Sequence, residues 1–145
     1  MKHGYSSLRC GLIGEHLGHS FSKEIHEQIF DYKYGIKEIP KDQLDAFMKA
    51  RAFKGINVTI PYKQTVIPYL DEISERAKKI GAVNTVYNRN GYLYGDNTDF
   101  SGMVALIRRN GIELQGRKPT SEEINSILKN LNSYILSTHP NLKIL

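Results

Sequence analysis

Hydrophobic and polar residues alternate along the chain in short apolar runs and longer stretches with helical spacing. Residues 8–13 form an apolar run before a glycine, which predicts a buried first strand. From Ser22 the apolar positions fall on one helical face, Ser22 can cap this helix, and Gly35 can end it. Residues 36–39 read as the next strand.

The same alternation continues through the middle of the chain. Asp42 is expected to cap a second helix, and residues 55–60 alternate as a strand that ends at a proline. A helix over residues 74–80 precedes two β-rich segments joined by Asn90-Gly91, a pair that favours a hairpin turn. A helix over residues 99–109 follows. The order of elements predicts an α/β sandwich with a mixed sheet.

The C-terminal part has a different pattern. Residues 116–119 are polar and end in a helix breaker, which predicts a connection. Thr120 and Glu123 then have the spacing of a capping box. The helix that they begin carries one apolar stripe, made of Ile124, Ile127, Leu128, Leu131 and Ile135. A stripe of this length must dock on another surface.

Composition limits the classes of function. A chain of 145 residues fits one domain, and it contains no apolar run long enough to span a membrane. The net charge is +5, but the basic residues are scattered among acids, which argues against a nucleic-acid interface and suits an anionic small molecule. Cys10 cannot form an internal disulfide and lies in an apolar run, so we expect a buried thiol and a cytoplasmic location.

Three polar clusters follow predicted strands, where open α/β sheets bind ligands. Ser20 and Ser22 stand at a helix N-terminus and can receive a carboxylate, although Ser22 can also serve only as a cap. Thr59 and Lys63 leave the end of a strand, and a solvated surface lysine is the alternative for Lys63. The third cluster contains Asn84 and Asp99, and helix capping is the alternative for Asp99. No metal site is expected.

Together these clusters resemble the shikimate dehydrogenase family over residues 8 to 114. Four motifs carry the resemblance in order: His19-Ser20-Phe21-Ser22 with His26, Asn57-Val58-Thr59-Ile60-Pro61-Tyr62-Lys63, Gly81-Ala82-Val83-Asn84-Thr85, and Gly95-Asp96-Asn97-Thr98-Asp99 with Gly102. The resemblance implies a three-layer α/β sandwich with a mixed, mostly parallel sheet. It also implies NADP-dependent interconversion of shikimate and 3-dehydroshikimate, a step of aromatic amino-acid biosynthesis.

The resemblance assigns roles to individual residues. Ser20 and Ser22 would hold the substrate carboxylate. The residues that would bind the ring hydroxyls are Thr59, Lys63, Asn84 and Asp99. Lys63 and Asp99 would form the catalytic pair, because a lysine beside a carboxylate can give or take the proton on the reacting oxygen. Glu75 matches a position near the cofactor in some relatives.

The sequence departs from the family in one large respect. None of its twelve glycines forms the G-x-G-x-x-G turn of a dinucleotide site, so the NADP-binding domain is expected to be missing. We expect residues 1–115 to form the substrate-binding domain, 116–119 to replace the absent domain, and 120–145 to pack back on the first part. Whether such a truncation is engineered or natural is left open.

Such a chain should bind shikimate without turnover and without binding NADP. Three alternatives remain open: a quinate-preferring relative, a non-catalytic shikimate-binding module, and a dimerisation module. A homodimer is a further expectation.

Overall fold

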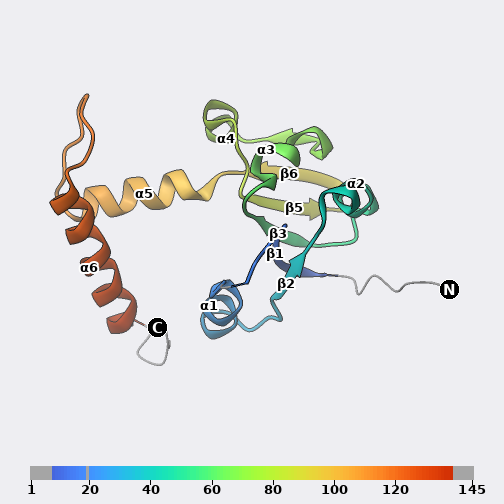
Figure 1. Ribbon diagram of the computed structural model, residues 1–145, viewed down its shortest axis with the longest axis horizontal. Helices are drawn as coiled ribbons and strands as arrows, with labels where there is room; N and C mark the ends of the chain where they lie inside the picture. Colours follow the sequence, from blue (N-terminus) through green and yellow to red (C-terminus); the bar gives the residue numbers. More distant parts are fainter. Residues whose placement is uncertain (1–7, 19, 139–145) are drawn as a thin grey trace. The chain divides into compact units, whose positions relative to one another are not determined.

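The computed structural model describes residues 8–18 and 20–138 and divides into two compact units, Met1–Thr98 and Asp99–Leu145. The first unit carries the elements expected to form the substrate-binding domain (Figure 1). They are β1 (Cys10–Gly14), α1 (Ser22–Ile29), β2 (Gly35–Glu38), α2 (Lys41–Ala50), β3 (Gly55–Val58), α3 (Tyr62–Thr65), the 3-10 helix η1 (Ile67–Tyr69), β4 (Glu72–Ile73), α4 (Glu75–Ile80), β5 (Thr85–Arg89) and β6 (Tyr92–Asp96).

A six-stranded mixed sheet organises this unit, with strand order β2-β1-β3-β5-β6-β4. Strand β1 pairs in parallel with β2 and β3, and β4 pairs in parallel with β6. Strand β5 is antiparallel to both of its neighbours. The mixed, mostly parallel α/β sheet expected from the sequence is therefore confirmed.

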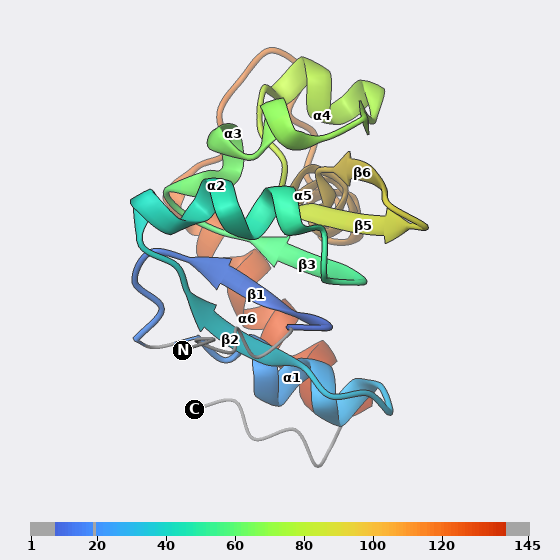
Figure 2. The same ribbon diagram turned by 90° about the vertical axis from the view of Figure 1, so that its right-hand side faces the viewer.

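Helices cover both faces of the sheet, as Figure 2 shows for α1 and α2. On one face, strand residues such as Ile13, Val58 and Leu93 join side chains of α2, α3 and α4 in the main core. Burying a large aliphatic side chain contributes about 1.5–3 kcal/mol, so this face dominates the stability of the unit. The other face holds a smaller cluster of Leu12, Leu17 and Tyr34, beside α1. Three layers result.

Several predicted helix ends are wrong by a few residues. Helix α1 ends at Ile29 and not at Gly35, and its N-cap is Phe21 and not Ser22. Helix α2 begins after Pro40, so Asp42 lies inside its first turn and not at its cap. An acidic group in the first turn still favours the helix through the macrodipole, which explains why capping and first-turn positions are hard to separate by sequence.

The hairpin turn is confirmed. Asn90 and Gly91 both have positive φ, 53° and 89°, and they join β5 to β6. The short elements α3, η1 and β4 were not anticipated, since two to four residues carry no readable periodicity. Cys10 is only partly buried.

The second unit contains α5 (Thr98–Arg109), which begins at the unit boundary, and α6 (Ser121–Thr138). The capping box is confirmed, because Thr120 N donates to Glu123 Oε2 (2.9 Å) and Glu123 N donates to Thr120 Oγ1 (3.2 Å). Asn130 Nδ2 donates to Asn110 Oδ1 (2.5 Å), which links α6 to the segment after α5.

The apolar positions of these two helices are only partly covered. No residue of α5 is buried, whereas Ile127 of α6 is buried. The side chains of Leu128, Leu131 and Ile135, as well as residues 139–145, lie outside the described part. The docking of α6 on the first unit therefore stays a prediction. No helix in residues 8–18 and 20–138 has the length and hydrophobicity that a membrane span requires.

Candidate functional site

An open cleft of about 420 Å³ lies where β1 and β3 end. Its lining residues are Leu12, His16, Leu17, Gly18, Ser20, Phe21, Ser22 and Thr59. Three side chains predicted to bind substrate, Ser20, Ser22 and Thr59, therefore meet in one cleft. His19, part of the same motif, lies outside the described residues. His16 was not anticipated, because no sequence pattern singled it out.

Gly14 makes this cleft geometrically feasible. A Cβ atom at residue 14 would come within 2.9 Å of Thr59 Cγ2 and 2.6 Å of Leu17 Cδ2, so a larger residue would displace both neighbours. The main chain fixes the same junction, since Thr59 N donates to Ile13 O at 3.0 Å. The main chain of Thr59 is thus fixed to β1 directly after β3 ends.

The two serines do not have the arrangement of a simple helix cap. Ser22 is the first residue of α1, and its side chain makes no capping hydrogen bond. Instead, Ser22 N donates to Ser20 Oγ at 3.2 Å. Both side chains are half-buried. The Ser22 hydroxyl has no capping role here, which removes the alternative that competed with ligand binding.

Backbone hydrogen bonds place Lys63 and Asn84 near the C-terminal end of β3. Val83 N donates to Lys63 O at 2.8 Å, and Val58 N donates to Asn84 O at 2.8 Å. Lys63 lies in α3 and is half-buried, which differs from a fully solvated surface lysine. Thr59, Lys63 and Asn84 therefore surround the C-terminal end of β3.

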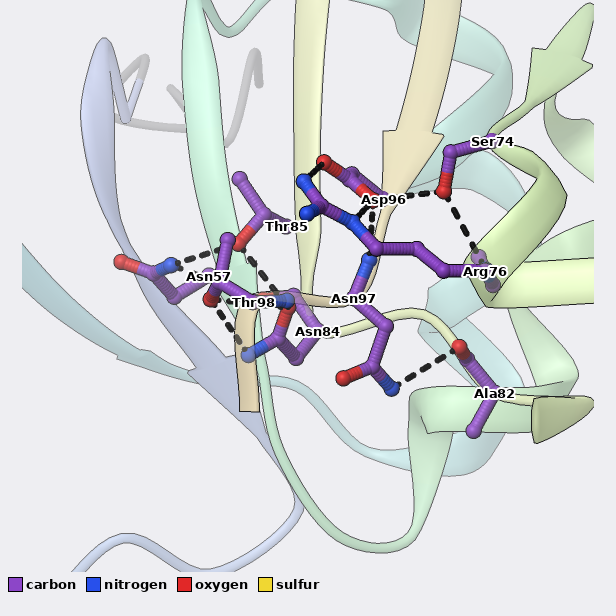
Figure 3. A network of polar contacts seen from close by, with 10 residues as sticks. Asn57, Ser74, Arg76, Ala82, Asn84, Thr85, Asp96, Asn97 and Thr98 are labelled. Carbon is purple, nitrogen blue, oxygen red and sulfur yellow. Dashed lines mark hydrogen bonds and ion pairs between the residues drawn. The ribbon is translucent and has the colours of Figure 1, made fainter. Parts of the chain in front are cut away.

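Asn84 is the centre of a polar network near this end of β3 (Figure 3). Its Oδ1 accepts from Thr98 N (2.9 Å) and Thr85 Oγ1 (3.0 Å), and its Nδ2 donates to Thr98 Oγ1 (2.9 Å). The side chain is 8% exposed. Its described contacts involve one of the two N–H donors of the amide.

The network continues through Thr85 to Asn57 and Tyr34, which the site prediction did not include. Asn57 Nδ2 donates to Thr85 Oγ1 (3.2 Å), and Tyr34 OH donates to Asn57 Oδ1 (2.7 Å). Burial raises the pKa of the Tyr34 phenol, which keeps it protonated as a donor. Asn57 and Thr98 stand inside the motifs quoted above, and that position was the only available signal for them.

Of the other predicted site residues in the first unit, Lys63, Asn84 and Glu75 are not among the residues that line this cleft. Asp99 is the second residue of α5, in its first turn, and it is the first residue of the second unit. Its pairing with Lys63 stays a prediction. Glu75 is the first residue of α4. Its side chain is 80% exposed and forms an ion pair with Lys78, with 2.7 Å between Glu75 Oε1 and Lys78 Nζ. Its role near a cofactor also stays a prediction.

Two features typical of cofactor sites are a glycine-rich turn after the first strand and a cluster of metal ligands. The segment after β1 reads Glu15-His16-Leu17-Gly18, which lacks the glycines that let backbone amides approach a pyrophosphate. In residues 8–18 and 20–138, no group of three His, Cys, Asp or Glu side chains is arranged to hold a metal.

Comparison with known proteins identifies the family of this chain. The profile of the shikimate dehydrogenase substrate binding domain matches residues 12–86, just over half of the chain. The chain belongs to this family. All three polar clusters begin within or beside the matched range, so the cleft lies in the substrate-binding part of the family fold.

Individual relatives support the assignment. The shikimate dehydrogenase (NADP(+)) of Clostridium beijerinckii is 48% identical over 113 residues, which cover 72% of this chain and 42% of that protein. The chain thus spans about half or less of the length of the curated relatives it matches.

Solved structures give the same fold. Shikimate 5-dehydrogenase from Thermus thermophilus in complex with shikimate is 34% identical with a TM-score of 0.68, covering 77% of this chain and 45% of that one. The ligand-free 5-ketofructose reductase of a Gluconobacter strain is 30% identical with a TM-score of 0.64, covering 73% and 41%. Solved proteins that resemble this chain are therefore named for different substrates.

Proposed function

We propose that this chain is the substrate-binding half of an NADP-dependent shikimate dehydrogenase and that it binds shikimate or 3-dehydroshikimate. The observation that supports this most strongly is the meeting of Ser20, Ser22 and Thr59 in one cleft. The similar protein from Thermus thermophilus was solved with shikimate, a cyclic acid with one carboxylate and several hydroxyls.

Each group of polar side chains suits one part of such a ligand. The hydroxyls of Ser20 and Ser22, beside the N-terminus of the eight-residue helix α1, would hold the carboxylate. The ring hydroxyls would be bound by Thr59, Lys63 and Asn84, which surround the end of β3. Asp99 would complete the set from the start of α5.

Lys63 and Asp99 would move the proton on the reacting oxygen. A lysine ammonium can stabilise negative charge that develops on a carbonyl oxygen and can donate its proton there, and a neighbouring carboxylate keeps the amine charged. NADP would supply the redox chemistry, since the relatives are named as NADP(+)-dependent shikimate dehydrogenases. Because the sequence contains no G-x-G-x-x-G turn, we propose that this chain alone neither binds NADP(H) nor turns substrate over.

Isothermal titration with shikimate, quinate and 5-ketofructose tests the binding proposal. We expect saturable heat with shikimate and weaker or no heat with the other two compounds. Preferential binding of quinate or of 5-ketofructose would assign the chain to a different substrate. The absence of binding heat with all three compounds would contradict the proposal. Fluorescence titration with NADPH should show no saturation at low micromolar concentration.

Complementation separates an enzyme from a binding module. If the chain supplies an activity in the cell, it should rescue a strain that lacks shikimate dehydrogenase, and we expect no rescue by this chain alone. A homodimer also remains part of the proposal, and sedimentation equilibrium would test it.

A further inference from the structure

The carboxylate of Asp96 lies at the end of β6 and is held on several sides (Figure 3). Its Oδ1 accepts from Ser74 Oγ (2.5 Å), Arg76 Nε (2.7 Å) and Asn97 N (2.7 Å). Its Oδ2 accepts from Arg76 Nη2, which completes a two-pronged contact with the guanidinium. The Asp96 side chain is only 17% exposed. A carboxylate with this many charge-assisted partners has little freedom to move.

These contacts join α4 to the exit of β6. Ser74 is the N-cap of α4, since its hydroxyl accepts from Ala77 N at 3.1 Å while it donates to Asp96. Ser74 N also donates to Gly95 O at 2.9 Å. The first turn of α4 and the last residue of β6 are therefore fixed to one another by both main-chain and side-chain bonds.

The residues that follow β6, Asn97 and Thr98, connect Asp96 to the polar network around Asn84. Asn84 N donates to Asp96 O at 3.0 Å, and Asn97 is buried with its amide donating to Ala82 O at 3.1 Å. The next residue is Thr98, which makes two 2.9 Å contacts with the Asn84 side chain. A shift of Asp96 would therefore be transmitted to the side-chain amide of Asn84, which is one of the proposed substrate-binding groups.

From these contacts we propose that Arg76 and Asp96 form a positioning pair, which holds Thr98 and the Asn84 amide in the geometry that binds substrate. The pair touches no ligand itself. This inference rests on the proposed function, because it concerns the same site. It assigns a role to Arg76, which no sequence argument singled out.

The chain offers a matched control pair, Arg51 and Asp71. Asp71 Oδ2 accepts from Arg51 Nη1 (2.6 Å) and from Leu93 N (2.7 Å), so it also combines a guanidinium contact with a backbone amide. Arg51 donates as well to Gly91 O, at the turn of the hairpin. This pair is at the opposite end of the β5–β6 hairpin from the Thr85–Asp96 register.

The experiment compares Asp96→Asn with Asp71→Asn, by melting temperature and by titration with shikimate. Both substitutions should lower the melting temperature. Only Asp96→Asn should weaken shikimate binding, by about tenfold, because misplacing a binding group by a fraction of an ångström is costly. Equal affinities in the two variants, or equal losses, would overturn the positioning role.

Two further measurements keep the test decisive. Arg76→Lys retains the positive charge but not the two-pronged guanidinium contact, so it should recover part of the shikimate affinity lost in Arg76→Ala. If the role of Arg76 were purely structural, affinity would change only as far as melting temperature does. In Arg76→Ala, the amide NMR signal of Thr98 should shift or broaden without any ligand. If the unmodified chain binds no shikimate, the proposed function fails. An unchanged Thr98 signal would instead overturn the positioning pair.

Discussion

Replacing Asn84 by alanine separates binding from stability, because β5 offers a second asparagine with a similar set of contacts. Asn84 accepts from Thr98 N and Thr85 Oγ1 and donates to Thr98 Oγ1. Asn88 donates to Arg51 O (2.8 Å) and Phe53 O (3.1 Å) and accepts from Gly91 N (2.7 Å). Each side chain therefore ties three neighbouring groups together, Asn84 directly before β5 and Asn88 near its end.

The cost in stability should be similar for the two substitutions. Net hydrogen bonds contribute about 1 kcal/mol each, and some of the abandoned groups regain water, so we expect each alanine variant to lose about 2 kcal/mol. In a unit of this size that loss corresponds to a fall in melting temperature of roughly 10 °C. Differential scanning calorimetry measures both values.

Affinity for shikimate should distinguish them. Asn84→Ala removes an amide that we propose to bind a ring hydroxyl, and it also releases Thr98, so binding should weaken by about tenfold or more. Asn88→Ala should leave the dissociation constant within about twofold, since residue 88 is remote from the site. The reasoning is refuted if the two variants bind shikimate equally well at a temperature where both are folded.

Three further substitutions or deletions have defined outcomes. Arg76 holds the pKa of Asp96 well below its usual range, so the stabilisation from the Asp96 carboxylate is fully present above the unfolded pKa of about 4 and is lost progressively as pH falls from there through the folded pKa. The gap in melting temperature between the unmodified chain and Asp96→Asn should therefore be widest at pH 7 and should shrink steadily as pH falls below about 4, and a constant gap would contradict this. Ser22→Ala should weaken shikimate binding with little change in melting temperature, because Ser22 makes no capping bond; the opposite pattern would restore the capping role. Ending the chain after Gly116 should give a poorly cooperative melt if α6 docks on the first unit, since each buried aliphatic side chain is worth about 1.5–3 kcal/mol; an unchanged cooperative melt would sink the docking.

Sequence reasoning predicted the elements that have strong periodicity or specific turn chemistry. Strand β1, helix α2 and the hairpin at Asn90-Gly91 follow from apolar spacing and from the need for positive φ. The capping box of Thr120 and Glu123 also formed as its spacing indicates. These features depend on residues close in sequence, so a short window contains the information.

Features that depend on distant residues were harder to predict. Ser22 was expected to cap α1, but the hydroxyl of Ser20 is what contacts the Ser22 amide. Asn57 and Thr98 entered the site network through partners 28 and 14 positions away, which no local pattern encodes. The ion pair of Arg76 with Asp96 likewise joins residues 20 positions apart. Only the folded sheet brings these side chains together.

Mapping shikimate onto the chain by two-dimensional NMR tests the central claim most directly. The account predicts saturable shifts in the amide signals of Ser22, Thr59 and the Asn84 side chain, with little change at Asn90 and Gly91 on the far end of the hairpin. Saturable shifts confined to other parts of the chain, or no shifts at millimolar shikimate, would contradict the claim that this cleft binds the substrate.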